Sequence, residues 1–217
     1  MKTRVLNIFF FVTLISLTSC GDKAKEAETK EAVKAASAEN SATTYKANTE
    51  KSTIEWKGFK PTGSHFGIIA IGDGELNVDN NSIQSGNFSI DMSSIVVNDI
   101  PKEDEDNAKL TGHLKSAEFF DVETYPTSTF EVTGIETVDG KTMLSGNLTM
   151  KDATNNISFP VSTEMKDDML MLTSETFTID RSKWNVKYGS KSFFDNLGDK
   201  FINDDMELKI TLVATKA

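Results

Sequence analysis

The sequence predicts an all-β domain, an eight-stranded antiparallel up-and-down barrel with short helices in its long connections. Three observations predict it: apolar and polar residues alternate from Ser52 onward, many of the alternating segments are longer than ordinary strands, and glycines recur inside them. Alternation is typical of strands with one buried and one solvated face. Long antiparallel neighbours joined by short turns favour a closed barrel over a sandwich of short strands.

Eight segments carry the strand pattern. The last is the clearest, because Met206, Leu208, Ile210 and Leu212 share one face while polar residues occupy the other. Turn-forming residues separate several segments, as in DNNS, VDGK and KDD. In chain order the expected strands are 52–60, 68–79, 82–97, 128–139, 141–151, 156–166, 168–180 and 206–214.

Glycines inside the expected strands support a sheet that curls. Glycine normally weakens a strand, so its recurrence there indicates bends or bulges. The positions concerned are Gly67, Gly72, Gly74, Gly86, Gly134 and Gly146.

Two segments break the alternation. Residues 105–122 place apolar residues at helical spacing behind a group of acids that suits a helix N-terminus. Residues 191–202 place Phe193, Leu197 and Phe201 four residues apart, interrupted by Gly198. We expect short helices or turns that cover an opening of the barrel or plug the ends of its core.

Residues 1–19 form a predicted signal peptide. Lys2 and Arg4 precede an apolar run over 8–17 that is too short to span a bilayer. The run ends in LTSC at 17–20, which resembles the lipobox of bacterial lipoproteins, in which the cysteine is acylated and becomes the mature N-terminus. An ordinary cleaved signal peptide is the alternative.

Lipidation at Cys20, the only cysteine, would tether the protein, because two or more acyl chains give stable anchoring. We therefore expect a membrane-anchored lipoprotein of the bacterial cell envelope, on its periplasmic face or outer surface. Residues 20–43 are rich in Ala, Lys and Glu and predict a flexible spacer, and residues 44–217 predict a single barrel domain. The net charge of −10 argues against a nucleic-acid partner.

The interior of an eight-stranded barrel either fills with side chains or holds one small ligand. Strands of about 11 residues give a barrel roughly 28 Å tall, close to the hydrocarbon thickness of a bilayer. A long lipid tail would therefore fit along the axis. The residues expected to line this interior are Trp56, Phe66, Phe88, Ile90, Phe130, Val132, Leu148, Phe159, Met171, Phe177, Leu208 and Ile210.

Five motifs occur in an order that resembles the YceI-like family over about residues 45–217. They are WKGFK with SHFG, GNFSIDMSSI, HLKSAEFFDVETYPTSTFEV, GNLTMKDAT and FTIDRSKWNV. The resemblance implies a lipocalin-like barrel in the bacterial periplasm with a long apolar tunnel for a polyisoprenoid or similar amphiphile. It implies no catalytic residue and no cofactor. The expected lipid anchor departs from many members and favours a role at the membrane.

His65, His113 and Arg181 are the candidates for polar residues at the mouth of the barrel. No zinc-ligand spacing accompanies the two histidines, so we expect no metal site. Ser64 and His65 are adjacent, which on a strand points them to opposite faces and argues against a nucleophile–base pair. Arg181 is the only arginine of the domain. A structural ion pair with Asp180 or a neighbouring carboxylate is the favoured interpretation, with contact to a ligand phosphate as the alternative.

We therefore expect a non-catalytic envelope lipoprotein that stores, transfers or sequesters a long-chain isoprenoid or similar lipid. A protein-interaction module with a filled barrel is the second hypothesis, and a lipid-modifying enzyme centred on His65 is the third. The sequence leaves a homodimer open.

Overall fold

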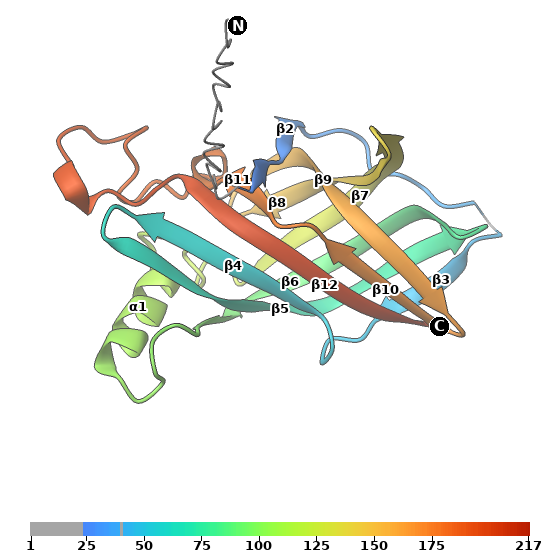
Figure 1. Cartoon of the computed structure of the whole chain (residues 1–217), viewed down its shortest axis with the longest axis horizontal. Helices are drawn as coiled ribbons and strands as arrows, with labels where there is room; N and C mark the ends of the chain where they lie inside the picture. The colour runs from blue at the N-terminus through green and yellow to red at the C-terminus, as the bar shows by residue number, and fades with distance from the viewer. Residues whose placement is uncertain (1–23, 40) are drawn as a thin grey trace, which may run out of the picture.

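The computed structural model describes residues 24–39 and 41–217 (Figure 1). The predicted all-β class is confirmed, because the strands of the described residues form one twisted sheet that wraps around a common interior. The strands are β1 (Lys25–Glu26), β2 (Glu28–Glu31), β3 (Thr43–Ala47), β4 (Thr53–Lys60), β5 (Gly63–Asp79), β6 (Ser82–Val97), β7 (Thr127–Val138), β8 (Lys141–Met150), β9 (Ala153–Lys166), β10 (Met169–Ser174), β11 (Phe177–Asp180) and β12 (Asp205–Lys216).

The strands occupy eight positions around a closed barrel. From β4 to β10 each strand pairs antiparallel with the next, and β12 closes the ring by pairing with β10 on one side and β4 on the other. Two positions hold a broken strand. β3 and β4 both pair with β5 and β12, and β10 and β11 both pair with β12. All eight predicted segments are therefore strands.

The two ends of the barrel differ. At one end the connections are tight turns, where Asn80, Asn81, Asp139 and Gly140 have the positive φ angles that such turns demand. At the other end lie α1 (Glu105–Lys115), η1 (Arg181–Trp184) and η2 (Gly198–Lys200) on two long connections. We call this the helical end. The helix expected at 105–122 is thus shorter, and residues 191–202 form turns with the single 3₁₀ turn of η2.

The barrel has a seam where the β10–β11 strand breaks. β10 pairs with both β9 and β12, but β11 pairs with β12 alone among the barrel strands, so the facing edges of β9 and β11 separate. β1 fills this seam by pairing parallel with β11, and β2 pairs antiparallel with β9. The prediction of a flexible spacer over 20–43 is wrong for residues 25–31. This segment cannot fold alone, but the free edges of β9 and β11 offer it hydrogen-bond partners.

The seam segment is held by side chains as well as by backbone pairing. Ala27 is buried, and its N–H donates to the Thr178 carbonyl at 2.8 Å. Further along, the Asn147 side-chain amide of β8 accepts from the Val33 N–H at 3.1 Å and donates to the Val33 carbonyl at 2.6 Å. The segment therefore crosses the outside of the barrel as part of its hydrogen-bond network.

Close approach explains four of the six expected glycines, Gly67, Gly74, Gly86 and Gly146. A Cβ on Gly146 would overlap the Phe130 ring, and one on Gly67 would overlap the Val96 carbonyl oxygen and lie 2.9 Å from the Trp56 ring. This close approach explains why the SHFG motif ends in glycine. Any side chain at Gly67 would displace Trp56 from the interior or push apart β5 and β6.

Placing a charge in the seam tests whether β1 and β2 belong to the folded barrel. We expect Ala27→Asp to lower the free energy of unfolding by about 3 kcal/mol, because it buries an unpaired carboxylate. Urea denaturation measures this change. Ala32→Asp is the matched control, since Ala32 is exposed on the same segment and its substitution should have little effect. Equal, small effects of both variants would contradict the assignment.

Candidate functional site

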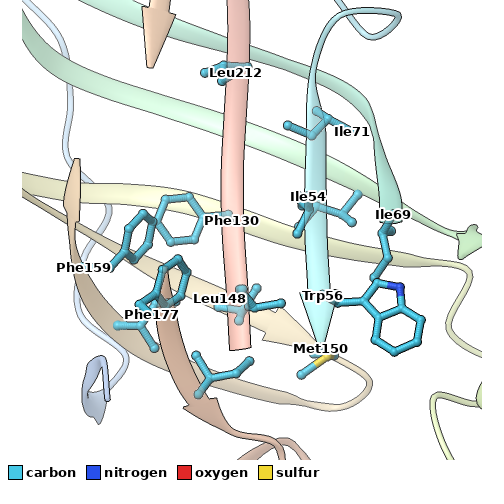
Figure 2. Close-up of a cluster of buried hydrophobic side chains, with 14 of the residues drawn as sticks. Ile54, Trp56, Ile69, Ile71, Phe130, Leu148, Met150, Phe159, Phe177 and Leu212 are labelled. Carbon is cyan, nitrogen blue, oxygen red and sulfur yellow. The ribbon is translucent and has the colours of Figure 1, made fainter. Parts of the chain in front are cut away.

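A cavity of about 50 Å³ lies at the centre of the barrel. Every one of the eight strand positions contributes to its wall, which shows that the sheet closes around it. Phe130, Phe159 and Phe177 lie together on one side of the interior, with Ile54 and Trp56 on the other (Figure 2). The lining residues are Ile54, Ile71, Leu76, Phe88, Ile90, Phe130, Leu144, Phe159, Leu172, Ile210 and Leu212, all apolar.

Aromatic packing shapes one wall of this interior. The Phe159 and Phe177 rings are stacked with centroids 4.3 Å apart and an interplanar angle of 6°, and Phe130 is tilted against Phe159 at 5.8 Å. Such contacts are favourable beyond simple area burial and fix the ring positions. This side of the interior is therefore a packed aromatic surface.

A second cavity, of about 60 Å³, lies at the helical end. Its lining residue Trp56 lies one inward position along β4 from Ile54, which lines the central cavity. Its lining residue Met206 lies two inward positions along β12 from Ile210, which also lines the central cavity. The two cavities therefore follow one axis. We call this axis the bore. The cavity at the helical end is lined by Trp56, Gly58, Phe59, Lys60, His65, Leu110, His113, Leu114, Phe119, Phe120, Arg181, Ile202, Asn203, Asp205 and Met206.

The three predicted mouth residues His65, His113 and Arg181 all reach this second cavity. They come from β5, α1 and η1, three elements far apart in the chain. His65 and Arg181 are engaged with other protein groups, whereas the His113 ring packs against aromatic side chains. Whether any of them touches a ligand stays a prediction.

His65 is paired with Asp99. Its Nδ1 lies 2.8 Å from Asp99 Oδ2, and the Phe66 N–H donates to Asp99 Oδ1 at 2.9 Å. Burial acts to raise the pKa of Asp99, but these hydrogen bonds outweigh it and hold the pKa below its ordinary value. Asp99, in the connection between β6 and α1, therefore holds the first residues of β5 in place.

His113 sits among aromatic rings on the last turn of α1. Its ring centroid is 4.6 Å from that of Tyr188 and 5.6 Å from that of Phe119. Burial lowers the pKa of His113; the Glu118 carboxylate, 3.9 Å away, opposes this shift and Lys60 reinforces it. Burial thus favours the neutral form of the histidine, and its ring packs as an aromatic residue.

Arg181 is fully buried and binds backbone carbonyls. Its guanidinium donates to the carbonyl oxygens of Val186, Tyr188, Ile202 and Asn203 at 2.5–3.1 Å. Nη2 also lies 3.4 Å from Asp204 Oδ1. The ion-pair partner is therefore Asp204, whereas Asp180 accepts from the Ser182 N–H and caps η1. Arg181 ties together both ends of the connection between η1 and β12.

Most of the other predicted lining residues face the interior. Trp56 reaches the cavity at the helical end, five of the predicted residues line the central cavity, and Val132, Leu148, Phe177 and Leu208 are buried in the core. Phe66 and Met171 were predicted wrongly, since they are 47% and 37% exposed. Their neighbours Gly67, Leu170 and Leu172 take the inward positions, so alternation sends Phe66 and Met171 outward.

Sequence reasoning missed a third cavity, of about 350 Å³, at the tight-turn end. Polar residues such as Asn81, Glu136 and Thr163 share its wall with Leu170 and Met165. The clustered turns DNNS and VDGK were the available signal, because turns joining alternate strands of a barrel must meet at one end.

No group of three or more His, Cys, Asp or Glu residues within 24–39 and 41–217 is arranged to hold a metal ion. No helix in these ranges has both the length and the hydropathy to cross a bilayer. Cys20, the predicted lipidation site, lies outside the described residues.

Comparison with known proteins identifies the family. The model of the YceI-like domain matches residues 45–214, and the chain therefore belongs to this family. Among solved structures, Burkholderia cenocepacia BcnA is similar with a TM-score of 0.61 and 22% identity over 78% of this chain and 99% of that one. A polyisoprenoid binding domain from Saccharophagus degradans, implicated in plant cell wall breakdown, has a TM-score of 0.56 and 13% identity over 80% and 98% of the two chains. No curated protein matches the chain.

Replacing Arg181 tests its role as the tie between the two ends of the connection. We expect Arg181→Lys to lower the free energy of unfolding by roughly 3 kcal/mol, because one ammonium group cannot reach the four carbonyls that the guanidinium bonds. Urea denaturation measures the change, with the partly exposed Lys183→Ala as a control. An unchanged stability of Arg181→Lys would show that the carbonyls need no such donor.

The lowered pKa of His113 predicts a pH dependence of stability. Below its ordinary pKa of about 6.5, the unfolded chain binds a proton that the folded protein resists, so the free energy of unfolding falls as pH decreases from about 7.5 to 5.5. His113→Gln should flatten this slope. Urea titrations across the range measure it, and a variant with the wild-type slope would contradict the prediction. Asp99 stabilises the folded protein throughout this range. Its effect on the pH dependence of stability begins only as pH falls below about 3.8, where this stabilisation is lost.

Proposed function

We propose that this protein binds the apolar chain of a long isoprenoid or similar amphiphilic lipid in its bore. The observation that carries the proposal is the central cavity, to which all eight strand positions contribute apolar side chains and none contributes a polar one. The Saccharophagus domain of the same fold is described as polyisoprenoid binding, which supports the same ligand class for this chain.

The dimensions of the bore favour a thin, flexible ligand. The cavities of about 50 and 60 Å³ lie along one axis, and β4 and β12 contribute side chains to both. A bulky fused-ring ligand would need one wide cavity, whereas a hydrocarbon chain can thread a succession of narrow ones as flexible side chains such as Met206 adjust. We therefore favour a chain ligand over a globular one.

The energetics suit exchange with a membrane. Each methylene moved from water into the bore is worth about 0.8 kcal/mol, so a long chain is held firmly against water. Moving the same chain from a bilayer gains little, because both environments are dry. A protein with this bore can load from and unload to a membrane, which fits storage, transfer or sequestration.

We further propose that the protein acts as a non-catalytic lipoprotein anchored at Cys20 in the bacterial cell envelope. The lipobox-like LTSC motif supports the anchor. The pairing of His65 with Asp99 and the carbonyl contacts of Arg181 supply architectural roles for both residues, which supports binding without chemistry.

Organic extraction of the purified full-length protein followed by mass spectrometry tests the proposal. We expect a co-purifying isoprenoid, quinone or fatty acid, while acyl chains bound covalently to Cys20 stay with the protein. Repeated extraction without any such lipid would favour the alternative of an interaction module with a filled barrel.

A blocking variant makes the test specific to the bore. Ile210→Trp places a larger side chain in the central cavity and should abolish lipid retention, at a stability cost of about 1–3 kcal/mol. Thr211→Trp is the matched control, because the next residue of β12 points to the outer face. Equal retention by the folded variants, verified by circular dichroism, would place the lipid elsewhere.

A further inference from the structure

The connection between η1 and β12 exposes a cluster of aromatic side chains. Phe193 is 46% exposed and Phe194 50% exposed, and Tyr188 of the same connection is 42% exposed. Neighbouring exposed rings on one loop are costly in water and mark a surface that is covered in use. We call residues 187–201 the aromatic loop.

The base of the aromatic loop is firmly held. Arg181 bonds carbonyls on both sides of it, and the Ile202 N–H donates to the Gly189 carbonyl at 2.9 Å. Asp204 Oδ2 accepts from the hydroxyls of Ser190 and Ser192 at 2.8 and 2.6 Å. The rings are therefore presented at a fixed place and need little ordering when they bind.

Two lysines of the loop lie over its aromatic rings. Lys187 Nζ lies 4.8 Å from the centroid of the Phe193 ring, and Lys191 Nζ lies 3.6 Å from that of Phe201. Lys200 is exposed on the same loop, which also carries Asp195 and Asp199. On a chain with a net charge of −10, a loop with more lysines than acids stands out. Aromatic rings flanked by lysines match the interface of an anionic bilayer.

The loop adjoins the opening of the bore. Ile202 and Asn203, which follow it directly, line the cavity at the helical end. In Figure 1 the loop (orange-red) and α1 lie at the same end of the barrel, the loop toward the side that carries β1 and β2 (blue), and Tyr188 at the start of the loop contacts His113 on the last turn of α1. Lys183 of η1 pairs with Glu26 of β1 at 3.3 Å.

We propose that the aromatic loop inserts Phe193 and Phe194 into the headgroup region of an anionic lipid bilayer and so sets the helical end of the bore against the membrane. The start of β1 is compatible with this orientation, because Lys25 follows Cys20 by five residues, a reach of at most about 18 Å. The tight-turn end is the competing surface. It exposes Val138, Met165 and Met169. Its turns carry Asp79, Asp139, Asp167 and Asp168 against Lys141 and Lys166, and an anionic surface repels this excess of acids. Membrane contact by the loop goes beyond ligand binding and holds or fails separately from it.

Tryptophan fluorescence tests which end meets the membrane. Phe194→Trp and Val138→Trp are made in the full-length protein, and each is mixed with vesicles of phosphatidylethanolamine and phosphatidylglycerol that contain lipids brominated near the headgroup. Trp56 and Trp184 are buried, so their emission provides a constant background. We expect Phe194→Trp to show a blue shift and bromine quenching, and Val138→Trp, 44% exposed in the free protein, to show neither.

Charge reversal tests the lysines. Lys187→Glu combined with Lys191→Glu, in the Phe194→Trp background, should remove most of the quenching, because each lysine near an anionic surface contributes about 1 kcal/mol, or roughly fivefold in affinity. Unshifted, unquenched emission from the Phe194→Trp variant overturns the proposal, as does equal quenching of the Phe194→Trp and Val138→Trp variants. Quenching of Phe194→Trp in a protein that yields no lipid on extraction would keep the membrane contact and reject the proposed ligand.

Discussion

Backbone hydrogen bonding around the closed sheet is the constraint on which the rest of the structure depends. An edge left open would expose unpaired N–H and C=O groups beside an apolar interior, which is unfavourable on both counts. Such an edge arises where β10 ends and β11 begins, because β10 pairs with β9 but β11 does not. Residues 25–31 supply the missing partners. A segment that looks like a linker is therefore part of the hydrogen-bonded sheet.

A second feature is that several conspicuous polar side chains near the bore are bonded to other protein groups, although the buried Trp56 Nε1 has no hydrogen-bond partner among the described residues. Arg181 bonds four carbonyls, and Trp184, also in the FTIDRSKWNV motif, donates its indole N–H to the Leu148 carbonyl at 2.8 Å. Asp99 holds His65 and the Phe66 N–H. These conspicuous residues fix the connections at the helical end and leave apolar surface facing inward. The same connections carry the aromatic loop, so one set of contacts shapes the opening and presents its exposed rings.

Much of the fold could be predicted from the sequence, because alternation reports which face of a strand is buried. It located all eight strand positions and most of the inward residues, from Phe88 to Ile210. It failed for Phe66 and Met171, where both faces of the strand are apolar and alternation gives no choice of face. It also failed for residues 25–31, since an Ala, Lys and Glu segment has no strand preference of its own and pairs only because β9 and β11 leave free edges. Contacts such as Asp99 with His65 join distant parts of the chain and leave no local pattern.

The central claim is that a long apolar chain occupies the bore inside the ring of strands. Crystals grown with a long-chain fatty acid that carries bromine at its methyl end test it most directly, because anomalous diffraction locates the bromine atom itself. The account predicts an anomalous peak between Ile54 and Phe159, in the central cavity. Peaks found only on the outer surface, with the cavity side chains unmoved, would contradict it.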